Sequence, residues 1–126
     1  MTKENPNIPE EEQLKAVCQG IPEFYNLLKR YTGKSAGHDN FRHFITITRN
    51  DLISYIRKHP QILKNHLHKK GEPKYHEQII LEYNENVFRV YEMDHDEPKD
   101  IKEYSDFAEA TADYLIFNLG LPPGFF

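Results

Sequence analysis

Two runs of β-branched and aromatic residues, 77–83 and 87–93, flank a short polar stretch. In the second run Val87, Arg89 and Tyr91 alternate with the residues between them, which is the twofold period of a β-strand. The intervening segment 84–86 contains two asparagines, and Asn tolerates the left-handed backbone of a short hairpin loop. The pattern predicts an antiparallel hairpin. An isolated hairpin is marginal in water, so helices must cover one of its faces.

The N-terminal third has helical periodicity. Proline at position 9 followed by three glutamates favours a helix start, because carboxylates suit the positive end of the helix dipole. The segment 20–22, Gly-Ile-Pro, interrupts the pattern and predicts a kink or a second helix that ends near Gly33. The two predicted apolar faces consist of Leu14, Val17 and Cys18, and of Phe24, Leu27, Leu28 and Tyr31.

The middle of the chain predicts a strand and two short helices. Residues 41–48 alternate as a strand would, and Thr48 or Asn50 is a suitable N-cap for a helix with Leu52, Ile53 and Ile56 on its apolar stripe. The segment His59-Pro60 breaks that helix, because the residue before proline disfavours helical backbone. A further short helix is expected over 61–69.

After the hairpin, residues 94–98 predict a polar loop that projects from the sheet, and Ile101 a short third strand. Ser105 or Asp106 caps a final helix that is apolar on more than one side, which is typical of a helix at the centre of a core. The predicted fold class is α+β: N-terminal helices, a small, mostly antiparallel sheet with a central hairpin, and a C-terminal helix packed on the sheet. We expect a single domain over residues 1–126, with 1–8 disordered.

Composition narrows the protein class. No run approaches the ~20 apolar residues of a membrane helix, and the polar N-terminus lacks the apolar stretch of a signal peptide. The single cysteine, Cys18, has no partner for an internal disulfide, and we expect it to be a buried apolar residue. These features together predict a cytoplasmic protein with no membrane partner.

Charge is unevenly distributed, although the net charge is only −4. Residues 57–76 contain six basic residues and one acidic residue. This basic segment is an alternative nucleic-acid interface, using Lys64, Lys69, Lys70 and Lys74, with Tyr55 and Tyr75 to stack on bases. The acidic C-terminal third would repel a polyanion, so a solvated helix face is the favoured interpretation.

Motifs for catalysis or metal binding are weak. Paired Cys-x-x-Cys and His-Glu-x-x-His patterns are absent, and the acidic loop at 94–97 lacks the glycine and glutamate of a calcium-binding loop. No serine has a nucleophile-elbow context. We therefore expect no cofactor, no metal and no enzymatic activity. A small histidine-dependent enzyme or metal protein using His43 and His76 remains the alternative.

Residues 92–113 contain nine acidic and two basic residues. Such a surface on a small domain suits a basic partner, because complementary charge speeds association and fixes orientation. Exposed tyrosines would supply anchors for the interface. The predicted partner-binding residues are Tyr83, Tyr91, Glu92, Asp94, Asp96, Glu97, Asp100, Glu103 and Tyr104.

The C-terminal half also resembles the immunity proteins of bacterial polymorphic toxins, including the contact-dependent inhibition type. The resembling segments are 74–76, the strands through 90–92, and 105–110 with 114–117, and together they cover residues 74–119. The resemblance implies a non-enzymatic cytoplasmic protein that binds and blocks one toxin. Its partner would be a cognate toxin with a basic domain, a nuclease being one case, and no catalytic residue is carried over.

Overall fold

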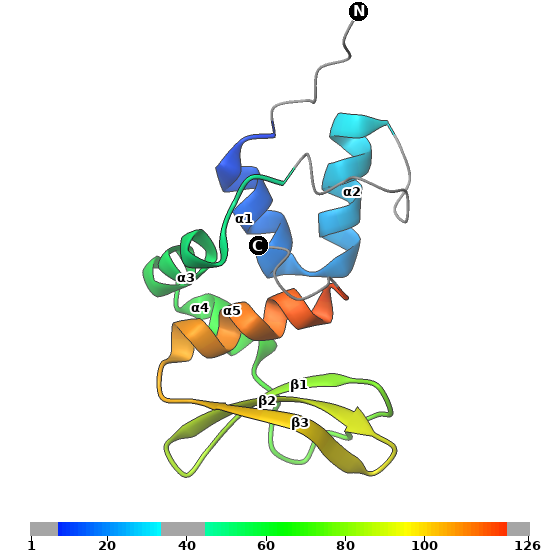
Figure 1. The fold of residues 1–126 in the computed structure, drawn as a ribbon, viewed down its shortest axis with the longest axis vertical. Coiled ribbons are helices and arrows are strands. Elements are labelled where there is room, and N and C mark those ends of the chain that lie inside the picture. Colours follow the sequence, from blue (N-terminus) through cyan, green and yellow to red (C-terminus); the bar gives the residue numbers. More distant parts are fainter. Residues whose placement is uncertain (1–7, 34–44, 121–126) are drawn as a thin grey trace, which may run out of the picture.

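The computed structural model describes residues 8–33 and 45–120 and confirms the predicted α+β class (Figure 1). The described parts contain five helices and one antiparallel sheet with strand order β1-β2-β3. In chain order the elements are α1 (Glu10–Gln19), α2 (Ile21–Thr32), α3 (Arg49–Lys58), α4 (Gln61–His66), β1 (Ile79–Asn84), β2 (Val87–Asp94), β3 (Glu97–Tyr104) and α5 (Phe107–Asn118).

Helix α5 lies between the sheet and the N-terminal helices, so it has apolar contacts on two sides (Figure 1). On one side Leu115 and Ile116 join the main core formed with α1, α2 and α3. On the other side Ala110 packs against Leu81 of β1 and Val90 of β2. The prediction of a central C-terminal helix is confirmed, and the reason is visible in this double burial.

Caps and breaks lie where the local sequence favours them. Thr48 forms a capping box with Asp51 at the start of α3. The side chain of Asp106 accepts the backbone N–H of Glu109 and so caps α5, which decides between the two predicted caps. Helices α1 and α2 are separate, and Gly20 between them has a φ of 118°, a conformation that L-residues rarely adopt.

The strand predicted over 41–48 is wrong for the described residues 45–48, which have no regular secondary structure. Ile45 and Ile47 are nevertheless buried, which explains the alternating pattern. The backbone N–H groups of Thr46 (2.8 Å) and Ile47 (3.3 Å) donate to the side-chain oxygen of Gln13. The side chain of Gln13 in α1 thus supplies the hydrogen-bond acceptor that a neighbouring strand would supply in a sheet.

Of the N-terminal residues expected to be disordered, 1–7 lie outside the described residues, and Ile8 contradicts the prediction. Its side chain is buried in the main core. Its carbonyl accepts a hydrogen bond of 2.8 Å from the amide of Gln13. An apolar contact and a satisfied backbone group therefore fix this position. Cys18 is buried as expected, and burial raises the pKa of its thiol to about 12.

The predicted hairpin is confirmed, with the pairs Ile80–Tyr91 and Leu81–Val90 at its centre. Only Glu85 and Asn86 form its turn, and both have positive φ (54° and 65°), as two-residue hairpin turns require. Helix α4 is three residues shorter than predicted. The chain leaves the helix at Leu67, because the next N–H, that of His68, donates to the carbonyl of Leu81.

The expected polar loop over 94–98 is wrong, because only residues 95 and 96 form the turn between β2 and β3. The third strand is eight residues long, and all but its last residue are exposed. Strand β3 pairs only with β2 and so forms one edge of the sheet. Charged side chains and a proline are common on edge strands, where they discourage pairing with other chains. Its residues therefore lack the apolar alternation that identifies an inner strand.

A β-bulge bends β3 where it passes Tyr91. The pairing runs from Val90–Lys102 to Glu92–Lys99, so β3 has one extra residue over this interval. Asp100 lies in the bulge with a φ of 55°. Aspartate tolerates this left-handed conformation better than most residues, and bulges re-aim side chains.

The face of the sheet opposite α5 is covered by the loop between α4 and β1. Ile80, Tyr91 and Met93 form a small buried cluster on this face, which we call the far-face cluster. The ammonium of Lys74 donates to the hydroxyl of Tyr91 (2.6 Å) and to a carboxylate oxygen of Glu82 (3.2 Å). These contacts hold the loop against the sheet.

The Asp106 carboxylate caps α5 and forms an ion pair with Arg57 of α3. It therefore makes the free energy of unfolding depend on pH in the acidic range. Partial burial alone raises its pKa, but hydrogen bonds from Arg57 and from the Glu109 N–H outweigh burial, so the pKa lies below its ordinary value of 3.8. A lowered folded-state pKa adds stability that is fully present above the unfolded-state pKa. That stability is lost as the pH falls through the folded-state pKa.

We predict that Asp106→Asn, which retains a capping side chain, lowers the free energy of unfolding by about 1 kcal/mol at pH 7. The difference from the unsubstituted chain should begin to shrink below about pH 4, where the unfolded-state carboxyl becomes protonated, and should disappear only below the lower folded-state pKa, where the carboxyl is protonated in both states. Urea denaturation at pH 7, 4 and 3 measures this. Ser105→Ala removes the rival cap and is the control, with no expected change at any pH. A pH-independent deficit in Asp106→Asn would contradict the assignment.

Candidate functional site

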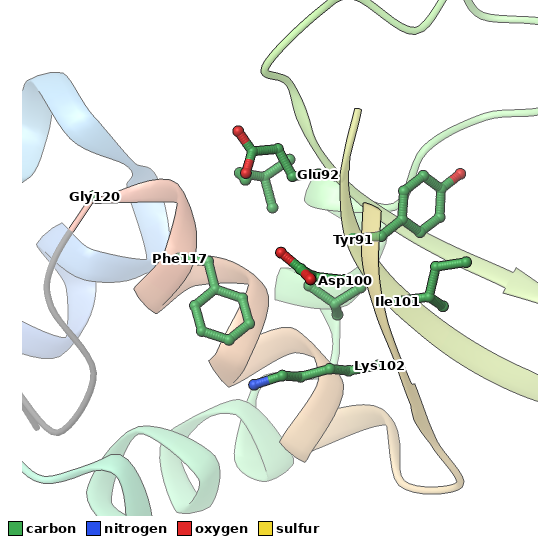
Figure 2. Close-up of a pocket in the computed structure, with 9 residues that line it drawn as sticks. Tyr91, Glu92, Asp100, Ile101, Lys102, Phe117 and Gly120 are labelled. Atoms are coloured by element: carbon green, nitrogen blue, oxygen red, sulfur yellow. The ribbon is translucent and has the colours of Figure 1, made fainter. Parts of the chain in front are cut away.

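A pocket of about 600 Å³ lies between the sheet and the C-terminal end of α5. Its apolar lining comes from Ile79, Val90 and Phe117. Glu92 and Asp100 add carboxylates that extend from the sheet towards α5 (Figure 2). The pocket exists because α5 covers only part of this face of the sheet, and because the bulge turns Asp100 towards the uncovered part.

The electrostatic environment of the pocket favours a cation. Gly120, just beyond α5, lines the pocket, and the last turn of α5 has no basic residue. The unpaired carbonyls at a helix C-terminus carry a partial negative charge, which adds to the two carboxylates. Lys102 offsets part of this charge, although its ammonium lies 4.9 Å from the centre of the Phe117 ring and points beneath it (Figure 2).

Five carboxylates gather where β2 and β3 meet. We call this group the acidic end; it consists of Glu92, Asp94, Asp96, Glu97 and Asp100. Within the described residues, none of the five forms an ion pair with a lysine or arginine. Lys99 is the cross-strand neighbour of Glu92 and reduces the local charge. Glu103, also predicted for this surface, lies elsewhere and pairs with Arg89 at 2.9 Å.

The rest of the predicted acidic span is neutralised within the fold. Asp106 pairs with Arg57 (2.8 Å), and Asp113 with Arg49 (2.7 Å). The predicted acidic span therefore divides into the acidic end and a group paired with arginines, which consists of Glu103, Asp106, Glu109 and Asp113. The hydrogen bond to Asp113 is the main cause that raises the pKa of the Arg49 guanidinium, which stays charged.

The three predicted tyrosines occupy different environments. Tyr83 is 49% exposed and its ring lies against Phe88. Tyr91 is only 4% exposed, so the prediction that it presents its ring to a partner is wrong; its side chain belongs to the far-face cluster. Tyr104 is half-buried and donates to Asp113 at 2.6 Å, and burial followed by this hydrogen bond raises its pKa.

The basic segment is also partly used within the fold. Lys74 is bound to Glu82 and Tyr91, and Tyr55 stacks on His59 with ring centres 4.2 Å apart. Lys64, Lys69, Lys70 and Tyr75 are exposed. Of the proposed nucleic-acid interface, one lysine and one aromatic ring are thus engaged in other contacts.

Two histidines and an aspartate meet at the turn between β2 and β3. The backbone N–H of His95 donates to Nδ1 of His76 at 2.8 Å, and the two ring centres are 4.4 Å apart. Nδ1 of His95 lies 3.1 Å from a carboxylate oxygen of Asp94. The alternative predicted from the sequence combines His76 with His43, which lies outside the described residues. The sequence pattern of β2 could not reveal this cluster, because His76 comes from a different segment, the loop before β1.

Comparison with protein-family models, curated protein sequences and solved structures gives no match. Among the described residues, no helix has both the length and the apolar character needed to cross a membrane. The features of the described residues that bear on function are the acidic end and its pocket.

Proposed function

We propose that this domain is a non-enzymatic binding protein of the immunity class, which neutralises a bacterial toxin by docking its acidic end on a basic surface. The observation that carries the proposal is the acidic end itself: five carboxylates without lysine or arginine partners in the described parts, beside an apolar pocket. A nuclease is a suitable target, because it needs positive charge to hold phosphate.

The pocket gives the proposed interface a point of specificity. Interface energy is concentrated in a few anchors that fill desolvated pockets, and arginine and aromatic side chains are the commonest anchors. An arginine from the toxin fits this pocket. Its methylene stem would lie on Phe117 and its guanidinium would meet Glu92 and Asp100. The resemblance of residues 74–119 to immunity proteins supports the same class of function.

The test is binding to a candidate toxin domain, sought first in the reading frames that neighbour this one, measured by titration calorimetry. We expect Asp96→Lys with Glu97→Lys to weaken binding by about thirtyfold, corresponding to roughly 2 kcal/mol for two reversed interface charges. Glu92→Gln with Asp100→Asn tests the pocket, with an expected loss of about tenfold. Asparagine is used at position 100 because it tolerates the positive φ.

The matched control for Asp96→Lys with Glu97→Lys is Glu10→Lys with Glu23→Lys, which changes the net charge by the same amount on exposed positions of α1 and α2, away from the sheet (Figure 1). It should leave binding within twofold at physiological salt, where distant surface charges are screened. Equal losses in the control and the acidic-end variants would reject the assigned surface. Failure of the unsubstituted domain to bind or protect against the toxin would reject the function.

A further inference from the structure

We propose that His76, Asp94 and His95 form a binding site for a divalent transition-metal ion of the zinc type. One ligand atom from each of these residues lies within 4.8 Å of the other two. Two imidazoles and one carboxylate are ligands that suit zinc, nickel and copper, whereas calcium and magnesium prefer all-oxygen sites. Water would complete the coordination, because all three side chains are exposed.

The backbone brings these residues together from two separate segments. His76 belongs to the loop before β1, which returns to the sheet where the Glu77 N–H donates to the carbonyl of Met93 at 2.7 Å. Glu77 and His95 both have positive φ (67° and 57°), so each segment turns sharply beside the cluster. Turns of two segments that are held by backbone hydrogen bonds provide a preformed frame for the ligands.

Metal binding requires small rearrangements that this position allows. Donor atoms bound to one tetrahedral zinc ion lie about 3.4 Å apart, so the side chains must move closer by about an ångström. Nδ1 of His76 already accepts the His95 N–H, and a metal that takes this lone pair releases the N–H to water. Losing this hydrogen bond costs little free energy, because the turn is exposed and water accepts a hydrogen bond from the released N–H.

The charges around the cluster favour a cation. The carboxylate of Asp96 lies in the same turn, that of Glu97 begins β3, and Glu77 places an oxygen 3.8 Å from Nε2 of His76. A bound ion would also join the loop before β1 to the β2–β3 turn. That loop covers the cluster of Ile80, Tyr91 and Met93, so binding should stabilise the folded chain by mass action.

The experiment uses the full chain without a histidine tag and titrates it with zinc chloride by calorimetry. We expect one zinc ion per chain, with His76→Gln and His95→Asn each weakening the affinity at least tenfold. Asparagine at position 95 preserves the tolerance for positive φ. His59→Gln is the matched control, since His59 is exposed and outside the cluster, and it should leave the affinity unchanged.

A second measurement keeps the test independent of folding of the variants. In the unsubstituted chain, zinc should shift the backbone amide signal of His95 most, because that N–H loses its acceptor, and should raise the unfolding temperature. Absence of stoichiometric zinc binding would overturn the proposal. So would equal weakening by His59→Gln, or magnesium binding as tightly as zinc. The test needs no toxin, so its outcome is separate from that of the inhibitor proposal.

Discussion

Gln13→Leu is expected to lower the free energy of unfolding by roughly 3 kcal/mol. The Gln13 side chain is fully buried and makes four hydrogen bonds, two through its oxygen and two through its nitrogen. Leucine has a similar volume, so the change removes the hydrogen bonds and not the packing. The N–H groups of Thr46 and Ile47 and the carbonyl of Ile8 would lose their partner. A buried backbone group without a partner costs about 1–3 kcal/mol.

Urea denaturation followed by circular dichroism measures this effect as a lower midpoint at unchanged slope. Gln19→Leu is the control, because Gln19 is exposed at the end of the same helix, and its expected change is within about 0.5 kcal/mol. If the two variants were equally stable, Gln13 would not be what holds residues 45–48 on the helices.

The second large effect is expected for Tyr91→Ala, a loss of about 3 kcal/mol. This change removes the largest side chain of the far-face cluster and leaves a cavity beneath the loop that covers it. It also removes the hydroxyl that accepts from Lys74 and donates to Glu82 at 2.9 Å. Tyr91→Phe separates the two contributions, because it retains the ring, and about 1 kcal/mol is expected from the hydroxyl alone.

Tyr83→Ala is the matched control for Tyr91→Ala. Tyr83 lies on the neighbouring strand but is half-exposed, and its main contact is the cross-strand ring of Phe88. We expect a loss of about 0.5–1 kcal/mol, the usual value of an exposed cross-strand pair. Thermal and urea unfolding of both variants measure the contrast. A loss of equal size at the two positions would contradict the assignment of Tyr91 to the core.

The sequence predicted best those elements whose residues form their own local pattern. The hairpin over 79–94 follows from alternation and from an Asn-rich turn, although the positive φ falls on Glu85 and Asn86 and not on both asparagines. The central position of α5 follows from its apolar character on two sides. Prediction was poorer where another segment supplies the partner. Residues 45–48 alternate like a strand, but their backbone partner is the side chain of Gln13, which no local pattern reveals.

The sequence predicts charge segment by segment. In the fold, some acidic residues of one segment are paired with arginines of another. Nine acidic residues over 92–113 predict one surface, yet Arg57 and Arg49 of α3 neutralise Asp106, which caps α5, and Asp113 within it. Ion pairs depend on which helices become neighbours, so sequence spacing alone cannot assign them. The acidic end remains because β2 and β3 continue past the part of the sheet that α5 covers.

By itself the sequence determined the α+β class, the hairpin and the burial of Cys18, because these depend on local periodicity and on residue type. Only the tertiary structure decided that Tyr91 is buried, that β3 is a full edge strand, and that His76 meets Asp94 and His95. Each of these depends on contacts between segments far apart in the chain. The physical reason is that local pattern fixes the period of an element, whereas its neighbours in space fix what each side chain touches.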